Sequence, residues 1–338
     1  MSGSLLEVRD LVQVHRLRGA RGGSQTLRAV DGVSFEIGPG ESVGLVGESG
    51  CGKSSLARAL VQLPRPTEGE VRFRDQDLCR LRGGALLRAR LGMQMVFQDP
   101  HSSVNPRMSV ANIVAEPLRL RGGTGRRQVR ARVRELLDMV RLPASRYEAR
   151  RAGELSGGEC QRVAVARALA GSPELLICDE AVSALDVSVQ AQLLNLFEEL
   201  RSELGLAYLF ISHDLAVVRH MSDRVLFMYL GRICEEIDAG DLDRAPRHPY
   251  TAALMSLVPG TQRDRSVMAL TGEPPSAASI PAGCRFHTRC WCARDQCATQ
   301  EPALVATEQG GRVACLFPLA PQPEPVGDPL LSYRPPGP

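Results

Sequence analysis

The sequence predicts an α/β fold built around a largely parallel sheet. Short apolar runs of strand length alternate with helical segments along most of the 338 residues, which is the pattern of a sheet whose strands are joined by helices. One run, SVGLVG (42–47), leads into a glycine-rich loop and then a helix. Another, ELLICDE (174–180), carries four consecutive apolar residues and ends in two carboxylates, as a buried strand with a functional end would.

The expected elements follow the chain in a simple order, and beyond about residue 258 proline, glycine and cysteine become so frequent that a different small unit begins. Their limits come from hydrophobic periodicity and from glycine and proline punctuation. In chain order they are a β-rich opening sheet over 5–46, a helix over 54–63, a strand with its turn over 69–78, helices over 104–170, a strand over 174–180, a helix over 187–204, a strand over 207–214, and a further helix and strand.

The composition says more about where the chain is located than about which partners it binds. The 41 basic and 38 acidic residues give a formal charge of +3, so no overall field selects nucleic acid or an anionic membrane. The longest apolar runs, such as Ala207–Ile211, are far shorter than the roughly 18 residues of a membrane-spanning helix. The N-terminus has no signal-peptide pattern, so we expect a cytoplasmic chain whose ten cysteines are not paired as structural disulfides.

Arginine is dense between Arg119 and Arg151. We interpret this section as the solvated face of amphipathic helices. Nucleic-acid binding is the alternative, but the charges are not interleaved with a set of aromatic side chains on which bases could stack. We therefore expect no nucleic-acid partner.

Lys53 is the one lysine among the basic residues, and it stands in a phosphate-binding pattern. Gly47, Gly52, Lys53 and Ser54 fit G-x-x-x-x-G-K-[ST] between a predicted strand and a predicted helix. Backbone N–H groups and the helix N-terminus would hold the phosphates of a nucleotide. Lys53 would reach the β- and γ-phosphates, a position that a planar guanidinium fits poorly. The expected contact residues are Gly47, Glu48, Ser49, Gly50, Cys51, Gly52, Lys53, Ser54 and Ser55.

A nucleotide site that turns over also needs ligands for Mg²⁺ and a group that orients water. The hydroxyl of Ser54 would bind Mg²⁺, and Asp179 at the end of its strand would hold the ion through water. Glu180 would polarise the attacking water. The two carboxylates alone are weak evidence for a nucleotide site. Together with the phosphate loop they are strong evidence for one.

The order of motifs resembles that of the ATP-binding-cassette (ABC) family. Gln98 in MVFQDP is similar to the family's Q-loop, and LSGGE (Leu155–Glu159) to its signature sequence. SALD (Ser183–Asp186) resembles the D-loop, and His213 in ISHD the switch histidine. The resemblance covers roughly residues 5–255 and implies a P-loop NTPase fold of the ABC nucleotide-binding type.

This resemblance implies a site shared by two chains packed head to tail. The signature of one chain would contact the γ-phosphate bound by the other, through a helix N-terminus. Glu180, His213 and Gln98 would be catalytic, with Gln98 also sensing the metal beside Ser54 and Asp179. The residues implied for nucleotide contact across the dimer are Ser156, Gly157, Gly158, Glu159 and Asp186.

Longer segments, including RHPYTAALMSLVP (Arg247–Pro259), are similar to the ATPase subunits of oligopeptide and dipeptide permeases, and to the F-type subunit in particular. That implies an ABC domain over 5–258, with a helical subdomain at about 100–165, and a Cys-rich extension over 259–338. It also implies a peripheral location on the cytoplasmic face of the membrane. The implied partners are a second ABC ATPase subunit in a heterodimer, two transmembrane permease subunits and an extracytoplasmic substrate-binding protein.

Three other functions are alternatives to peptide import. A soluble ABC ATPase outside transport usually carries two cassettes or a long coiled-coil insertion, whereas this chain has one of each motif and no sustained heptads. An importer of nickel or other small solutes would look the same in this subunit. A regulatory, inactive partner is disfavoured because Lys53, Asp179, Glu180 and His213 are all present.

Three positions depart from the family pattern. Glu159 stands where the signature usually has glutamine, a change that we expect to be tolerated at a polar helix start. Ala181 replaces a proline after Glu180 and removes no catalytic group. His15 lies where an aromatic residue would stack on adenine, and an imidazole offers less stacking area.

The C-terminal cysteines have the spacing C-x5-C-x-C-x4-C-x17-C, without the C-x-x-C pair of a zinc ribbon. The passage resembles the permease-ATPase tail, whose pattern falls on Cys284, Cys290, Cys297 and Cys315 and holds an iron–sulfur cluster in some members. Cys292 would be the spare. A [4Fe–4S] cluster, zinc, and free or reversibly oxidised thiols stay open as alternatives.

Overall fold

The computed structural model of the chain describes residues 3–18, 24–123, 125–242, 246–258, 270, 272–308 and 310–320. The parts of the predicted C-terminal extension at 259–269, 271, 309 and 321–338 lie outside the described residues. None of the helices within the described ranges is long and apolar enough to cross a membrane.

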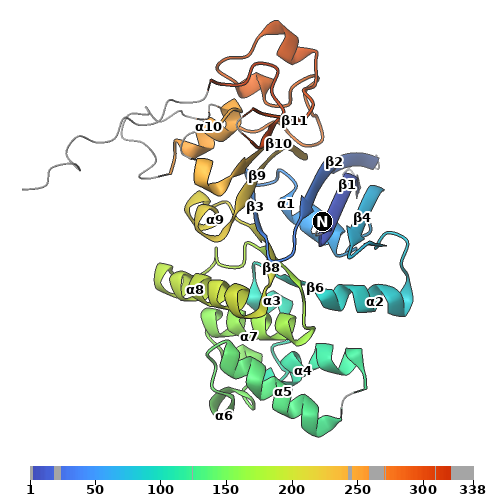
Figure 1. The fold of residues 1–338 in the computed structure, drawn as a ribbon, viewed down its shortest axis with the longest axis vertical. Helices are drawn as coiled ribbons and strands as arrows, with labels where there is room; N and C mark the ends of the chain where they lie inside the picture. The colour runs from blue at the N-terminus through green and yellow to red at the C-terminus, as the bar shows by residue number, and fades with distance from the viewer. Residues whose placement is uncertain are drawn as a thin grey trace, which may run out of the picture.

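The centre of the molecule is an eight-stranded sheet in the order β11-β12-β10-β9-β3-β8-β7-β6 (Figure 1). The neighbouring pairs from β9 to β6 are parallel, while β10 runs antiparallel to β9. Every residue of β3, β7 and β8 is buried, because helices cover both faces of the sheet. The strands are β3 (Ser42–Val46), β6 (Met93–Val96), β7 (Leu175–Asp179), β8 (Ala207–Ile211), β9 (Arg224–Tyr229), β10 (Arg232–Asp238), β11 (Val305–Ala306) and β12 (Arg312–Val313). This arrangement confirms the predicted α/β class.

A second, antiparallel sheet has the order β2-β1-β4-β5. It consists of β1 (Leu6–Arg18), β2 (Ser24–Ile37), β4 (Glu68–Phe73) and β5 (Gln76–Asp77). Helix α1 (Lys53–Leu60) packs between the two sheets, since Leu56 and Leu60 share one core with Leu6 and Leu45. The helix is shorter than the predicted 54–63, because Gln62 adopts a left-handed backbone conformation that ends it.

A group of helices packs at the end of the sheet that carries β6 (Figure 1). On α5 the buried residues Val129, Val133, Leu136 and Leu137 form one stripe, and arginines occupy the opposite, exposed face. This confirms the amphipathic interpretation of the arginine-dense section. The group comprises α3 (Pro100–Ser103), α4 (Val110–Arg121), α5 (Arg126–Met139), α6 (Ala144–Tyr147), η1 (Ala152–Glu154) and α7 (Gly157–Ala170).

The remaining helices flank the main sheet. Helix α8 spans the predicted range, and α2 was not predicted because the periodicity of its short sequence is weak. They are α2 (Gly83–Gly92), α8 (Val187–Leu204), α9 (Leu215–Met221), η2 (Ala239–Asp241) and α10 (Pro249–Met255).

The cysteine-rich segment adds to the main sheet at one edge (Figure 1). Strand β12 pairs with β10, so it covers backbone groups that an edge strand would otherwise expose. Two short 3₁₀ helices, η3 (His287–Arg289) and η4 (Asp295–Ala298), precede β11 and β12 in the chain. Phe286 is buried against Tyr229 of β9 and Tyr250 of α10, with ring centroids 5.3 and 5.5 Å apart.

Candidate nucleotide site

The glycine-rich loop lies between the end of β3 and the start of α1, and two of its glycines are required by close backbone approach. A Cβ atom at Gly47 would lie 2.2 Å from the carbonyl oxygen of Met228, and one at Gly52 would lie 2.0 Å from that of Ala29. Gly52 also has a φ of +111°, which side chains rarely allow. Ser49 and Gly50 are exposed at the tip of the loop. The loop is thus pressed against neighbouring backbone with its tip open to solvent.

Lys53 folds back into this loop. Its Nζ donates hydrogen bonds to the carbonyl oxygens of Gly47, at 2.6 Å, and Glu48, at 3.1 Å. The side chain is only 5% exposed, although it carries a charge. Cys51 lies beside it, with its sulfur 3.9 Å from Nζ, and burial raises the pKa of that thiol. A buried ammonium group held by loop carbonyls is placed to exchange those contacts for phosphate oxygens.

Ser54 and Asp179 meet where the start of α1 faces the end of β7. The Ser54 hydroxyl donates to Asp179 Oδ1 at 2.9 Å. Asp179 is 4% exposed, and this burial raises the pKa of its carboxyl group despite the hydroxyl bond and the nearby Arg58 and Lys53. A hydroxyl and a carboxylate side by side are hard oxygen donors, so the residues present fit a Mg²⁺ ion.

Glu180 lies between Gln98 and His213. The Gln98 side-chain amide donates to Glu180 Oε2 at 2.9 Å, and His213 Nδ1 is 3.5 Å from the same oxygen. Glu180 has a φ of +50°, a left-handed conformation that is costly for a residue with a side chain. Its N–H donates to the carbonyl oxygen of Ile211 at 2.9 Å, and Ala181 beside it is buried. The end of β7 is therefore pinned to the end of β8, with the Glu180 carboxylate turned toward the other two side chains.

His15 lies near the other side of α1. Its Nε2 is 3.2 Å from the hydroxyl oxygen of Ser55, and the ring is half-buried. The structure therefore places His15 against the first turn of the helix that follows the phosphate loop.

The signature segment begins α7. Ser156 caps this helix by accepting from the N–H of Glu159 at 3.3 Å, and Glu159 Oε2 accepts from the N–H of Ser156 at 2.9 Å. Tyr147 also donates to Glu159 Oε1 at 2.6 Å, which lowers the pKa of this carboxyl group. A Cβ at Gly158 would lie 2.5 Å from Val189, so α7 packs closely on α8.

Asp186 caps α8 by accepting from the N–H of Val189 at 3.0 Å. Asp186 and Ser156 are both exposed, and Gly157 is half-buried. Within the described residues, no hydrogen bond or ion pair joins the signature or Asp186 to the phosphate loop. The structure thus assembles the loop, the carboxylates, Gln98 and His213 in one chain, and leaves the signature apart from them.

Two further residues touch the loop and were not predicted. Arg289 forms a double ion pair with the carboxylate of Glu48, and the hydroxyl of Tyr250 accepts from the Glu48 N–H at 2.9 Å. Both come from segments that the sequence marks only by likeness, RHPYT and the cysteine-rich passage. No local pattern indicates their contact with the loop, since 202 and 241 positions separate them from Glu48.

The five C-terminal cysteines line one small cavity of about 20 Å³ together with His248 and His287. The sulfur atoms of Cys290 and Cys292 are 3.5 Å apart. Burial raises the pKa of Cys290 to about 12 and that of Cys315 to about 11. Within the described residues, no three cysteine, histidine or acidic side chains are close enough to hold a metal. The donor types suit a soft metal, whereas their present spacing does not form a ligand set.

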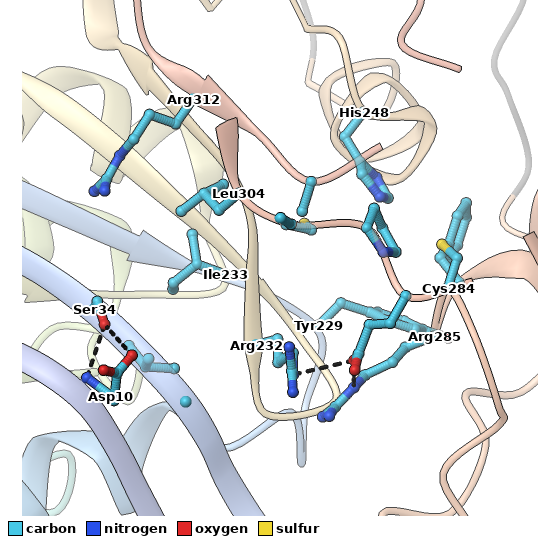
Figure 2. A pocket seen from close by; sticks show the side chains of 18 residues that line it. Asp10, Ser34, Tyr229, Arg232, Ile233, His248, Cys284, Arg285, Leu304 and Arg312 are labelled. Carbon is cyan, nitrogen blue, oxygen red and sulfur yellow. Dashed lines mark hydrogen bonds and ion pairs between the residues drawn. The ribbon is translucent and has the colours of Figure 1, made fainter. Parts of the chain in front are cut away.

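A larger cavity of about 260 Å³ lies between β2, the β9–β10 hairpin and the cysteine-rich segment (Figure 2). Arg232 and Arg285 both line it (Figure 2). The Nε atoms of these two arginines lie close to Glu301 Oε1, at 3.1 and 3.2 Å. Arg285 also pairs with Asp31 of β2. Of the predicted site residues only Cys284 lines this cavity, so it is separate from the nucleotide site.

Comparison with known proteins agrees with the motifs. Residues 30–183 match the ABC transporter family, and residues 234–297 match the oligopeptide/dipeptide transporter C-terminal region. The chain is 46% identical to the oligopeptide transport ATP-binding protein AppF of Bacillus subtilis, over 92% of this chain and 97% of that protein. It is also 46% identical to the oligopeptide transport ATP-binding protein OppF of Salmonella typhimurium, over 86% of this chain and 88% of that one.

Solved structures show the same architecture. The dimeric ATP-binding cassette MJ0796 bound to ADP and Pi has a TM-score of 0.62 at 29% identity, covering 69% of this chain and 98% of that chain. The structure of cbiO1 from Clostridium perfringens, part of the ABC transporter complex cbiONQ, has a TM-score of 0.60 at 25% identity, covering 71% of this chain and 90% of that chain. The P-loop NTPase fold of the ABC type is therefore confirmed, and the chain belongs to the family of ABC transporter ATP-binding proteins, within the oligopeptide-transport branch.

Proposed function

We propose that this chain is the ATP-hydrolysing subunit of an ABC importer for oligopeptides or dipeptides. The observation that carries the proposal is a complete set of nucleotide-site residues in a chain that matches oligopeptide transport proteins over nearly its full length. A soluble ABC ATPase outside transport and an inactive regulatory partner are both disfavoured by this combination. Import of nickel or other small solutes is the alternative that the test below must separate.

Lys53 would leave the Gly47 and Glu48 carbonyl groups and bind the β- and γ-phosphates, while the loop N–H groups surround them. Ser54, Asp179 and Gln98 would hold Mg²⁺, which neutralises phosphate charge when bound. Loss of the Ser54–Asp179 hydrogen bond would free the Ser54 hydroxyl oxygen and Asp179 Oδ1 to bind the ion. His15 would lie against the adenine ring.

Glu180 would polarise the attacking water, because it directly follows Asp179, whose carboxylate meets Ser54 at the start of α1. Gln98 and His213 hold that carboxylate from two sides and would move toward the γ-phosphate when ATP binds. His213 would then stabilise charge in the transition state. The side chain of His213 is 61% exposed, so it is free to make that movement.

Ser156, Gly157, Gly158, Glu159 and Asp186 would complete the site of a second chain. This role is supported by the exposure of Ser156 and Asp186, and by the separation of this surface from the chain's own loop. Val187, next to Asp186, is 84% exposed, so a partner that packs on this surface would bury it.

The partners would be a second ABC ATPase subunit in a heterodimer, two transmembrane permease subunits and an extracytoplasmic substrate-binding protein. The chain would then sit on the cytoplasmic face of the membrane. We propose a nucleotide-binding domain over 5–258, with its helical subdomain at about 100–165 facing the permease, and a C-terminal extension over 259–338.

For Cys284, Cys290, Cys297 and Cys315 we propose three alternatives: a [4Fe–4S] cluster, zinc, or free or reversibly oxidised thiols. The shared cavity supports a common ligand, whereas within the described residues no three donor side chains are close enough to hold a metal. Iron, labile sulfide and zinc should be measured on the full chain purified without oxygen. Iron with labile sulfide would identify the cluster, zinc would identify a zinc site, and a metal-free protein would leave free thiols.

The transport proposal is tested by purifying the chain with its companions from membranes of its own host. Two membrane chains, a second ATPase and peptide-stimulated ATP hydrolysis are expected when the binding protein is added. Stimulation by nickel or another small solute instead of peptides would favour the alternative cargo. Recovery without any membrane chain would favour a soluble ATPase.

A further inference from the structure

We infer that Arg289 is a positioning residue of the nucleotide site, through which the cysteine-rich extension holds the phosphate loop in its binding conformation and neutralises Glu48. This inference rests on the proposed ATP-binding function and adds a residue from outside the ABC motifs to it. It is carried by the contacts of Glu48, the second residue of the loop.

The Glu48 carboxylate is bound by a planar, two-pronged ion pair. Arg289 Nη1 lies 2.6 Å from Oε2, and Nη2 lies 2.9 Å from Oε1. This geometry fixes orientation as well as charge. The Arg289 side chain is 5% exposed and that of Glu48 is 21% exposed, so water screens the pair little.

Arg289 is itself held by groups outside the loop. Its Nη1 also donates to the hydroxyl of Tyr229 at 3.3 Å, and its guanidinium carbon lies 5.9 Å from the centroid of the Tyr229 ring. Tyr229 in turn packs against Phe286 and Tyr250. The packing of the extension on β9 and α10 therefore fixes the position of Arg289. Arg289 in turn fixes the position of the Glu48 carboxylate.

The backbone of Glu48 is fixed at the same time. The hydroxyl of Tyr250 accepts from its N–H at 2.9 Å, and its carbonyl oxygen accepts from Lys53 Nζ at 3.1 Å. Tyr250 is fully buried, so it cannot move away without disturbing the core. Glu48 thus links the extension to the lysine that we expect on the phosphates.

A second connection reaches the loop through the turn between β9 and β10. The N–H of Gly231 donates to the carbonyl oxygen of Cys51 at 2.8 Å. Arg285 of the extension donates to the carbonyl oxygen of Leu230, the neighbouring residue in this turn. The extension therefore supports both the start of the loop, at Glu48, and its middle, at Cys51.

Charge makes Arg289 more than a structural contact. A carboxylate beside bound triphosphate repels it unless a cation neutralises the carboxylate. Without Arg289, Glu48 would carry an uncompensated negative charge at the edge of the phosphate site. Loss of the arginine should therefore weaken nucleotide binding, and removal of the Glu48 charge should recover part of that loss.

The test measures equilibrium binding of a fluorescent ATP analogue with Mg²⁺ to the full-length chain, together with thermal unfolding. Arg289→Met should raise the Kd on the order of tenfold, and Arg289→Met with Glu48→Gln should return it to within about threefold of the wild type. Arg294→Met is the matched control. Arg294 is an exposed arginine of the same segment that stacks on Phe317, and its loss should leave the Kd unchanged.

The inference is overturned if folded Arg289→Met binds the analogue as Arg294→Met does, or if the double variant binds no better than Arg289→Met. If Arg289→Met does not fold, the same binding measurement on Arg289→Lys tests the inference, because lysine keeps the charge and loses the two-pronged geometry. A weakening of about threefold would support the inference, and wild-type affinity would overturn it. A wild-type chain that binds no analogue would instead overturn the proposed function, and the inference with it.

Discussion

The side-chain amide of Gln98 donates a 2.9 Å hydrogen bond to the carboxylate of Glu180, although 82 residues separate them in the chain. Their strands, β6 and β7, are neighbours in the sheet and run parallel, so the carboxyl ends of both reach the same edge. His213 follows β8, the next strand in the sheet, and approaches the same carboxylate oxygen at 3.5 Å. Three adjacent strands are thus followed by the side chains of Gln98, Glu180 and His213, which meet at one oxygen of the Glu180 carboxylate.

We predict that Glu180→Gln lowers ATP hydrolysis at least about 100-fold and leaves ATP binding intact. The amide still accepts from Gln98, but it cannot polarise water as a carboxylate does. Steady-state phosphate release and nucleotide binding should be measured on the same preparation. Glu198→Gln, an exposed change on α8, is the control and should keep both properties. Unchanged hydrolysis in Glu180→Gln would remove Glu180 from the catalytic role.

We predict that Lys53→Arg weakens ATP binding by tenfold or more, although the charge is kept. The side chain is 5% exposed and enclosed by loop carbonyl groups, so a larger planar group does not fit. The comparison variant is Arg58→Lys, which keeps a positive charge at an exposed position of the same helix. Near-normal ATP binding and hydrolysis by Lys53→Arg would show that the site requires charge alone.

We predict that Glu159→Gln retains ATPase activity within about twofold and costs less than about 1 kcal/mol of unfolding free energy. The glutamine oxygen can accept from either the Ser156 N–H or the Tyr147 hydroxyl, so one of the two contacts survives. Glu159→Ala loses both and should cost about 1–2 kcal/mol in chemical denaturation. Equal losses for the two variants would contradict a role for this cap.

Glu235 gives a prediction about pH. It is buried on β10 and accepts from the N–H groups of Arg247, at 2.6 Å, and His248, at 3.0 Å. Burial raises the pKa of its carboxyl group to about 7, above its usual value of 4.5. The unfolded chain therefore loses this proton first, and the contribution of Glu235 to stability decreases as pH rises from 4.5 to 7.

His248 changes the stability with pH in the opposite direction from Glu235. Burial lowers the pKa of its ring from 6.5 to about 4. Its contribution is present above pH 6.5 and is lost as pH falls toward 4. The two effects oppose each other between pH 4.5 and 6.5. Glu235→Gln should raise stability at pH 8 by on the order of 1–3 kcal/mol and leave a stability that increases from pH 4.5 to 6.5. Denaturant unfolding across this range checks it, and parallel curves for variant and wild type would contradict it.

The sequence determined the α/β class, the phosphate loop and most elements of the ABC core, because each is encoded in local spacing. The loop pattern around Lys53 and the apolar run ending at Asp179 are both contiguous in the chain. Helix α8 could be predicted from Val187 to about Leu204, and in the structure Asp186 caps it and Gly205 in a left-handed conformation ends it. The F-type likeness was also carried by contiguous segments, and the relatives AppF and OppF confirm it.

Only the tertiary structure decided which side chains meet. Ser54 and Asp179 are 125 positions apart, and Arg289 and Glu48 are 241 apart, so no spacing rule connects either pair. The first pair could be expected because parallel strands bring their carboxyl ends to one edge. The second pair could not, because it depends on the cysteine-rich extension adding strands to β10 and packing Phe286 against β9 and α10. Packing of this kind follows from the shapes of buried surfaces, which a linear pattern of residues does not specify.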